Sequence, residues 1–153
     1  MDLPVTARGR NLSAGVFLGL GSVAFLDEVV FHQLLHWHHF YDKSSSSMGL
    51  VSDGLFHAFS WFATVAGLLM VVGLVRDAKF AKLTFAVGML TGAGFFQLYD
   101  GLVQHKLLGL HQIRYGVPLL PYDVVWNVVA AVMLAAGVAL WAMTSRRQRR
   151  RES

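Results

Sequence analysis

Seven histidines occupy a chain of 153 residues that contains no cysteine. Without cysteine the chain can form neither a disulfide nor a thiolate metal site. Its imidazole and carboxylate groups are the remaining metal ligands, and imidazole suits Zn, Cu, Fe and Ni. The sequence therefore predicts a sulfur-free site built from histidine and acidic residues.

Three of the histidines, His32, His57 and His105, lie at similar depth in three separate apolar stretches. We expect them to be the primary ligands of a transition metal ion, and Cu, Zn or Fe is the expected element. Asp27 and Asp100 lie deeper in two of these stretches. They could bind a second ion, or orient the histidines by accepting hydrogen bonds from them.

Glu28 and Asp53 each lie one helical turn from a histidine and are alternative ligands. Cu(I) sites usually recruit Met or Cys, and on the outer side of the chain only Met48 is available, so Cu(II), Zn or Fe fits better. A further group is expected to support the ligands, or to gather and hand over metal: His36, His38, His39, His111, Gln104, Asp123 and Asn127.

A helical wheel of about 100° per residue gathers these polar residues into one sector. Glu28 and His39 fall close to His32 on this wheel. Asp27 and His38 fall about 120–140° to one side of it. The opposite faces are apolar, so we expect the polar sector to face the interior of a helix bundle and the apolar face to meet lipid.

Three other functions remain open at this stage. His32 and His105 could be the axial ligands of haem b, although the charged Asp27 and Asp100 nearby count against it. The acids and histidines could line a proton or cation pathway, but the inner half of the chain offers no polar continuation. They could also pair with one another in a structural or partner-binding protein, and whether the protein is an enzyme stays undecided.

Four apolar stretches must position these residues, and each is long enough to cross a bilayer, which takes about 20 helical residues. They cover residues 12–41, 50–75, 83–108 and 122–143. Only 14% of the residues are charged, against about 25% in soluble domains. We therefore expect a single all-α domain, residues 1–153, that forms a polytopic membrane four-helix bundle. The alternative, a soluble bundle, would need solvated helix faces that these stretches lack.

Basic residues predict the orientation of this bundle. Ten of the thirteen Lys and Arg lie before the first stretch, between the second and third, or in the tail at residues 144–153. The positive-inside rule then places both termini in the cytoplasm and the protein in the inner, cytoplasmic membrane of the cell. Next to a span, the run RRQRRR is expected to bind anionic lipid rather than nucleic acid. The lipid bilayer is the expected partner, and a membrane or periplasmic protein partner and a homo-oligomer remain open.

The first and third stretches match each other at an offset of 73 residues, with nine identities in 24 aligned positions. The second and fourth match more weakly at an offset of 70, where Asp53 pairs with Asp123 and His57 with Asn127. We expect two duplicated helix pairs of the same orientation, related by an axis near the membrane normal. The identities include glycines at close-packing spacing as well as polar residues: Gly15, Gly19, Asp27, His32 and His38 correspond to Gly88, Gly92, Asp100, His105 and His111.

The run FLDEVVFHQLLHWHHFYD, residues 25–42, resembles a family of small four-helix prokaryotic membrane proteins that is catalogued as a domain of unknown function. The family pattern looks like Asp-Gly-[Ile/Val]-x-x-His-Gln-x-Leu-x-Trp-His-His, and SDGLFHAF and LYDGLVQHKLLGLH also look like the family. The resemblance covers nearly the whole chain and implies the fold and a membrane location, without an activity. Glu28 departs from the pattern, since the family usually has Gly there, and it could add a carboxylate to the site.

Overall fold

The computed structural model describes residues 5–152, and it describes side chains for residues 6–146. Four α-helices account for most of the chain: α1 (Val5–Asp27), α2 (Ser46–Arg76), α3 (Lys82–Tyr99) and α4 (Leu120–Glu152). Two π-helices, η1 (Glu28–Leu34) and η2 (Asp100–Leu107), continue α1 and α3. Of the expected basic run RRQRRR, only Arg146 lies among the described side chains.

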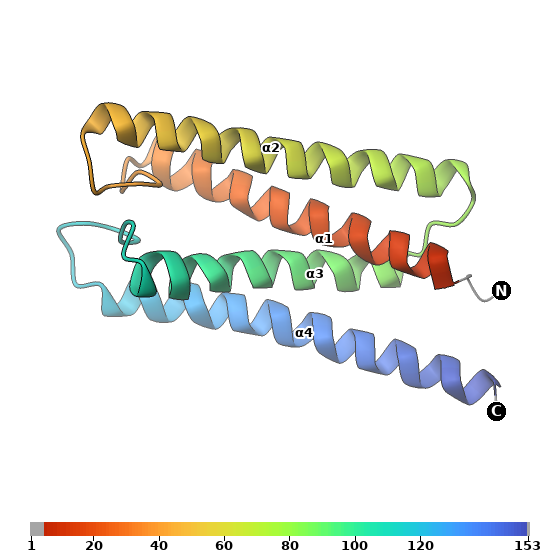
Figure 1. Cartoon of the computed structure of the whole chain (residues 1–153). Coiled ribbons are helices and arrows are strands. Elements are labelled where there is room, and N and C mark those ends of the chain that lie inside the picture. Colours follow the sequence, from red (N-terminus) through yellow and green to blue (C-terminus); the bar gives the residue numbers. More distant parts are fainter. Residues whose placement is uncertain (1–4, 153) are drawn as a thin grey trace.

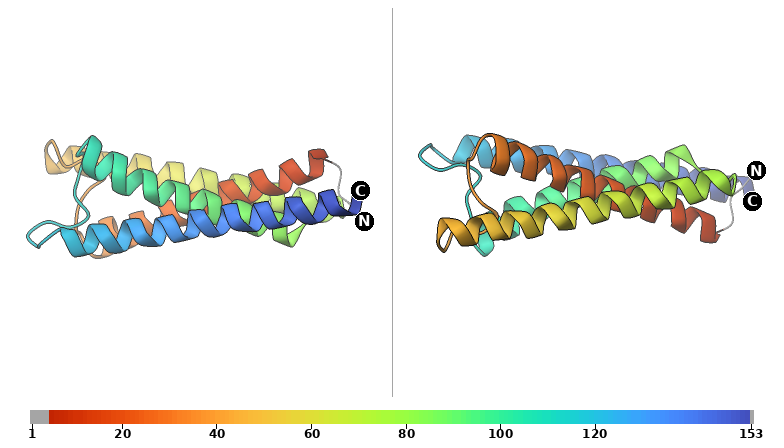
Figure 2. Two further views of the ribbon diagram at one scale, coloured as in Figure 1. Left: turned by 90° about the horizontal axis from the view of Figure 1, so that it is seen from below. Right: turned by 90° about the horizontal axis from the view of Figure 1, so that it is seen from above.

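The helices lie side by side in the order α2, α1, α3, α4, and α1 begins at the end of the bundle where α4 finishes (Figure 1). Seen from above and below, they cross at shallow angles (Figure 2). The expected all-α class and the packing of four helices are thus confirmed. Helices α1 and α3 form the central pair, and α2 and α4 cover its two sides.

Three segments are long and apolar enough to cross a membrane: Thr6–Leu34, Ser46–Arg76 and Leu120–Arg146. Helix α3 is not among them, because glycines and the polar Gln97 lower its hydropathy. It nevertheless packs between two of the candidate spans, α1 and α4. The structure therefore gives three candidate spans, where the sequence alone predicted four.

The backbones of α1 and α3 touch directly at four glycines. A Cβ on Gly15 or Gly19 would overlap a backbone carbonyl of α3, and a Cβ on Gly88 or Gly92 would overlap a backbone carbonyl of α1. Their spacing predicted this close approach, since small residues four apart form one flat strip on a helix. No larger side chain fits at these positions without separating the helices.

The outer helices pack in the same manner. Gly21 of α1 and Gly67 of α2 bring those two helices together, while Gly94 of α3 and Gly137 of α4 do so on the other side. In the described part of the chain, α1 has no backbone contact with α4, and α2 has none with α3. The bundle is therefore a row of four helices, in which side chains rather than backbone contacts connect α1 with α4 and α2 with α3.

A buried asparagine fixes the end of the bundle where α1 begins. The Asn11 Nδ2 donates to the Lys79 carbonyl at 2.9 Å, and its Oδ1 accepts from the Ala81 amide at 2.7 Å. Nearby, the Arg10 guanidinium donates to the Asp77 carboxylate at 2.8 Å and thereby lowers the pKa of Asp77. These contacts hold the loop between α2 and α3 against α1.

Replacing Gly19 by Ala should therefore destabilise the bundle, because the new methyl group must push α3 away. Overpacking of this kind costs about 1–3 kcal/mol in the free energy of unfolding. Gly54→Ala is the matched control, because a Cβ there meets no atom within 4 Å. The midpoint temperature of thermal unfolding in detergent should be lower for Gly19→Ala than for wild type, and it should not fall for Gly54→Ala. Equal midpoints would show that the helices do not depend on this contact.

Candidate metal centre

Both central helices change from α to π hydrogen bonding at their acidic residues. The Leu35 amide donates to the Val30 carbonyl at 2.9 Å, and the Leu108 amide donates to the Val103 carbonyl at 2.7 Å. Each bond spans five residues, which defines the π-helix, a rare form that is frequent at functional sites. The two π-helices lie at matching positions, and their last residues, Leu34 and Leu107, are 73 residues apart.

The π-helix changes which side chains share a face. Residues five apart lie about 140° from each other on an α-helix, and a wider turn brings them closer to the same side. Ligand atoms of Asp27, His32 and His38 all lie within 4.8 Å of one another. The expected polar sector therefore does bring these residues together, but the wheel overestimated the angle between Asp27 and His32 because it assumed uninterrupted α-helix.

The chain leaves each π-helix through a residue with left-handed backbone, His36 with φ of 50° and Gly109 with φ of 55°. The first helical segment thus ends at Leu34, although the apolar stretch continues to residue 41. The following loop crosses the end of the bundle, where the Phe40 amide donates to the Asp53 carboxylate at 2.7 Å. The Asp53 side chain thereby accepts a hydrogen bond from a backbone amide that would have bonded to a backbone carbonyl if the helix had continued.

Each of the two loops is held by a histidine of the other loop: His38 bonds to the second loop, and His111 bonds to the first. The His38 Nδ1 donates to the Ile113 carbonyl at 2.9 Å, and the His111 Nδ1 donates to the Phe40 carbonyl at 2.8 Å. Because a carbonyl only accepts, each neutral ring carries its proton on Nδ1 and a lone pair on Nε2. The two rings are stacked, with centroids 4.5 Å apart and planes 6° from parallel.

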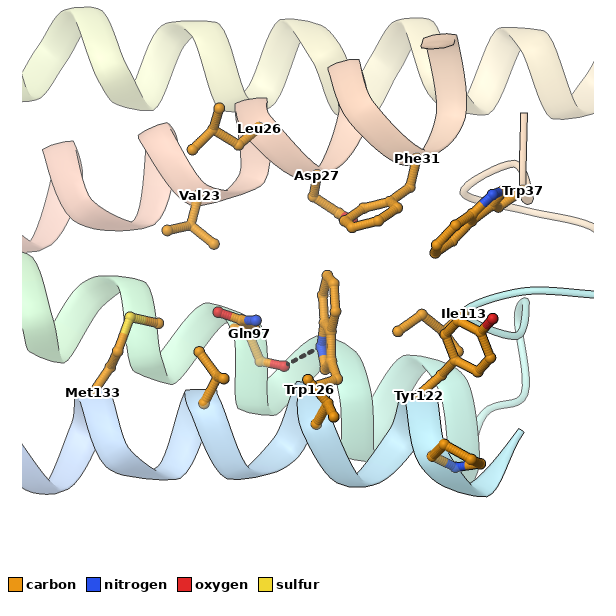
Figure 3. A pocket seen from close by; sticks show the side chains of 13 residues that line it. Val23, Leu26, Asp27, Phe31, Trp37, Gln97, Ile113, Tyr122, Trp126 and Met133 are labelled. Atoms are coloured by element: carbon orange, nitrogen blue, oxygen red, sulfur yellow. Dashed lines mark hydrogen bonds between the residues drawn. The ribbon is translucent and has the colours of Figure 1, made fainter. Parts of the chain in front are cut away.

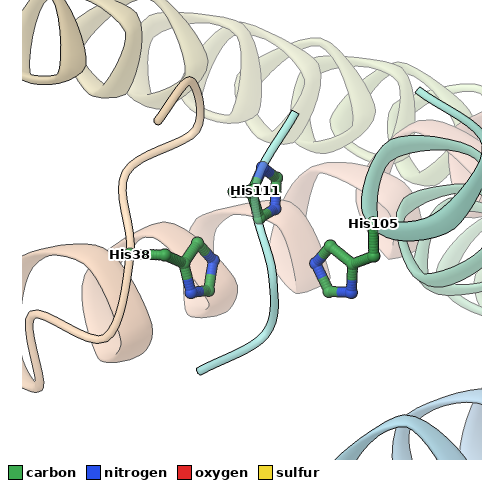
Figure 4. A group of neighbouring side chains, drawn as sticks. All are labelled: His38, His105 and His111. Carbon is green, nitrogen blue, oxygen red and sulfur yellow. The ribbon is translucent and has the colours of Figure 1, made fainter. Parts of the chain in front are cut away.

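His32 and His105 flank this stacked pair. The His32 ring lies 4.5 Å from the ring of His38, and the His105 ring lies 4.6 Å from that of His111. Figure 4 shows His38, His105 and His111 converging from two loops and η2. The Nε2 atoms of all four rings are buried and have no hydrogen-bond partner. Since buried polar atoms are normally paired, this four-histidine cluster has the donor set of a metal site.

A carboxylate accompanies each half of the cluster. Asp27 completes a group with His32 and His38 that could hold a metal ion. Oxygens of Asp100 lie 3.0 Å from the His105 Nε2 and 3.7 Å from the His111 Nε2. Asp27, His32 and His38 are two imidazoles and one carboxylate, the ligand combination of many non-haem iron sites. In the other half the group that could hold a metal is His38, His105 and His111, and the Asp100 carboxylate lies beside it. Each half thus contributes two imidazoles and one carboxylate of its own. We call them the first triad (Asp27, His32, His38) and the second triad (Asp100, His105, His111).

Two further acids lie against the other nitrogen of His32. Its Nδ1 donates to an Asp53 oxygen at 3.1 Å and lies 2.8 Å from a Glu28 oxygen. The second Asp53 oxygen accepts from the His39 Nδ1 at 2.6 Å. Glu28, His32 and Asp53 form another group that could hold a metal, but they also leave the His32 Nε2 free for the cluster. An acid that fixes the ring and tautomer of a ligand is usual in metal sites.

The site concentrates buried acids without buried basic side chains. Asp27, Glu28, Asp53 and Asp100 are at most 4% exposed, and no Lys or Arg is buried among the described side chains. Burial and the neighbouring imidazoles lower the pKa of His38 to about 2, and burial is the main reason that the pKa of His111 falls to about 4. Both loop rings are therefore neutral at pH 7, and a bound cation would compensate the acids.

Several expected site residues lie elsewhere. His57 is half-buried against the Phe25 ring, 5.3 Å away, and belongs to none of the groups that could hold a metal. His36 is exposed. Asp123 pairs with Lys106 at 2.6 Å. The structure does not bring these residues to the cluster.

Two other residues of the expected support group belong to η2 or lie against it. Gln104 is buried with an unpartnered Oε1. Asn127 lies where a Cβ on Gly101 would point, and its Nδ2 donates to the Asp123 carbonyl. His38 and His111, expected near the surface, are central instead. The signal that could have placed them there is their match to each other in the duplicated pattern.

Comparison with known proteins supplies a family. Residues 14–144 match the family described as "Predicted membrane protein (DUF2243)". The chain belongs to this family. The DUF2243 match contains both triads and both π-helices, and it confirms the family resemblance seen in the sequence. Searches of curated proteins and of solved structures gave no match.

Asp53 should be essential to the stability of this end of the bundle. Its carboxylate accepts hydrogen bonds from the His32 and His39 rings and from the Phe40 amide. Asp53→Ala leaves the Phe40 amide and the His39 Nδ1 without their acceptor, while the His32 Nδ1 keeps Glu28. An unpaired buried donor costs about 1–3 kcal/mol. Asp123→Ala, at the matching position of α4, removes a partly exposed ion pair that contributes about 1 kcal/mol or less. Thermal unfolding should separate the two variants, and a similar loss in both would contradict this role.

Proposed function

We propose that this protein is a multi-pass protein of the cytoplasmic membrane that holds a transition metal, Cu, Zn or Fe, between its central helices. The observation that carries the proposal is the convergence of four buried imidazole Nε2 atoms that form no hydrogen bond, with the Asp100 carboxylate as the ionic neighbour of two of them. A purely structural cluster would pair these atoms with one another or with the backbone. Instead, the ring nitrogens that do form hydrogen bonds are on the far side of His32, His38 and His111.

The two triads offer a site for up to two ions. The first triad and the second triad come from matching positions of the two halves, and we infer that a duplicated helix pair produced both. The site is asymmetric, because Glu28 adds a carboxylate beside His32 where the second half has Gly101. Two ions held between helices by histidines and carboxylates are a recurrent arrangement in four-helix bundles.

Burial favours a resident ion over one that is passed on. His32, His105 and His111 are at most 2% exposed, so an ion among them is surrounded by protein. This supports the chemistry of a small oxidoreductase more than that of a metal-handling protein. Met48, the only methionine of the outer side, is 49% exposed and lies outside the groups that could hold a metal, which disfavours a Cu(I) carrier.

The alternatives are less well supported by the geometry. A haem between His32 and His105 would need a roomy slot, and the rings of His38 and His111 fill the space beside both. A proton or cation pathway would need polar groups further inward, but residues 12–26 of α1 and 83–98 of α3 contain no His, Lys, Arg, Asp or Glu. A structural or partner-binding role would leave the buried Nε2 lone pairs of His32, His38 and His111 unexplained.

Elemental analysis of the protein purified in detergent should find Cu, Zn or Fe in stoichiometric amount, without the Soret band of a haem. Alanine at His38 or His111 should remove most of the metal, as should alanine at His32 or His105. His36→Ala and His57→Ala are matched controls and should retain it. A metal-free protein after reconstitution, or a metal content indifferent to all four cluster variants, would refute the proposal.

The orientation has its own test. We propose that α3 is also embedded, that both termini lie in the cytoplasm, and that the cluster lies in the outer half of the bilayer. A reporter enzyme that is active only in the cytoplasm should be active when it is fused after residue 153. A reporter that is active only outside the cytoplasm should be inactive at the same position. A tag inserted in the run Ser44 to Ser47 should be accessible only from outside the cell. Reversed accessibility would overturn the positive-inside assignment.

A further inference from the structure

A cavity of about 600 Å³ lies in the space between α1 and α4. Its wall comes from α1, η1, α3, α4 and the loops next to them, and it is mostly apolar (Figure 3). Leu26, Val125 and Val129 line it and are 45–64% exposed, so the cavity opens to the surroundings between the two helices. All three lie within candidate membrane spans, and the opening would therefore face lipid.

The inner wall of this α1–α4 cleft contains an acid that lacks a partner. Asp27 lines the cleft, is 4% exposed, and has a buried Oδ1 without a hydrogen bond. Asp27 also belongs to the first triad. A purely apolar occupant such as an acyl chain would offer the Asp27 carboxylate no hydrogen bond, whereas a hydroxyl group would donate to it.

Aromatic side chains surround the outer part of the cleft. The Phe31 ring lies 5.0 Å from the ring of Trp37 and 5.5 Å from that of Trp126, and the Trp37 ring lies 5.8 Å from that of Tyr122. These four rings line the cleft and contact each other at tilted or perpendicular angles. Such walls favour a flat ring, which can pack face or edge against them.

We propose that the α1–α4 cleft binds a membrane-soluble quinol. The ring would lie among the four aromatic side chains, one hydroxyl would donate to Asp27, and the apolar tail would leave between Leu26 and Val129 into the bilayer. Each part of the ligand matches one property of the cleft. The ring matches the aromatic walls, the hydroxyl matches the unpartnered carboxylate, and the tail matches the opening towards lipid. The proposal concerns binding and does not depend on the metal, although it places the ring beside the first triad.

A second cleft supplies the control. It lies between α2 and α3, has a volume of about 440 Å³, and contains Gln104 but no acid. Leu55 and Val125 occupy matching positions on α2 and α4, 70 residues apart, and they are 70% and 64% exposed. Tryptophan at either position should fill one cleft and leave the other open.

The test uses the full chain in lipid nanodiscs and a benzoquinol with a decyl tail, with binding measured by calorimetry. Wild type should bind saturably at about one molecule per chain. Val125→Trp should weaken binding at least tenfold, and Leu55→Trp should leave it unchanged. The dimethyl ether of the same quinol, which cannot donate a hydrogen bond, should bind at least tenfold more weakly. Val129→Phe serves as a second cleft variant if Val125→Trp does not fold.

The result that overturns the proposal is equal binding of quinol and ether, or an equal response to Val125→Trp and Leu55→Trp. Either would mean that the cleft holds only lipid chains or that the probe dissolves in the bilayer. Metal content is measured on the same samples, so the two proposals can fail separately. If Val125→Trp keeps its metal content but loses quinol binding, both the metal centre and the quinol site are supported. If a metal-free chain binds quinol, only the quinol site is supported.

Discussion

The direct backbone contact of α1 with α3 is the constraint on which the rest of the structure depends. In lipid no hydrophobic force draws helices together, so close packing must do so. Four glycines provide this packing, and no side chain separates the two helices along the contact. The two loops that follow the π-helices therefore lie against each other, and the histidines of both halves meet. A looser contact would widen the distance between the two triads by the same amount.

The candidate metal centre itself lowers the stability of the folded protein. It buries four acids, and in the described part of the chain only histidine, not Lys or Arg, is buried beside them. Buried charges and unpaired nitrogens are each unfavourable, and a structure retains them where they serve a site. The rigid glycine contact can hold such groups in place because its packing does not depend on them. Asp27 is the residue common to both proposed sites, since it belongs to the first triad and lines the α1–α4 cleft.

The sequence predicted the helices and the polar residue types, because hydropathy and the offset of 73 are visible in one chain. It did not predict the π-helices, since apolar periodicity assumes α-helix, and this error separated Asp27 from His32. The position of His38 depends on a hydrogen bond to a residue 75 positions away, which no local pattern contains. His57 lies one helical turn from Asp53 on the same face of α2, and at that level it meets the Phe25 ring instead of the cluster.

The crossed hydrogen bonds between the two loops have a consequence for how the protein is made. His38 holds the second loop and His111 holds the first, so neither loop is complete on one helix pair. A chain that enters the membrane from its N-terminus would already contain the residues of the first triad while only α1 and α2 are in place, but not the Ile113 carbonyl that positions His38. The ligands would come together after α3 and the loop behind it arrive. Loading of a metal would then be a late event in biogenesis, and it would mark a chain whose two halves have joined correctly.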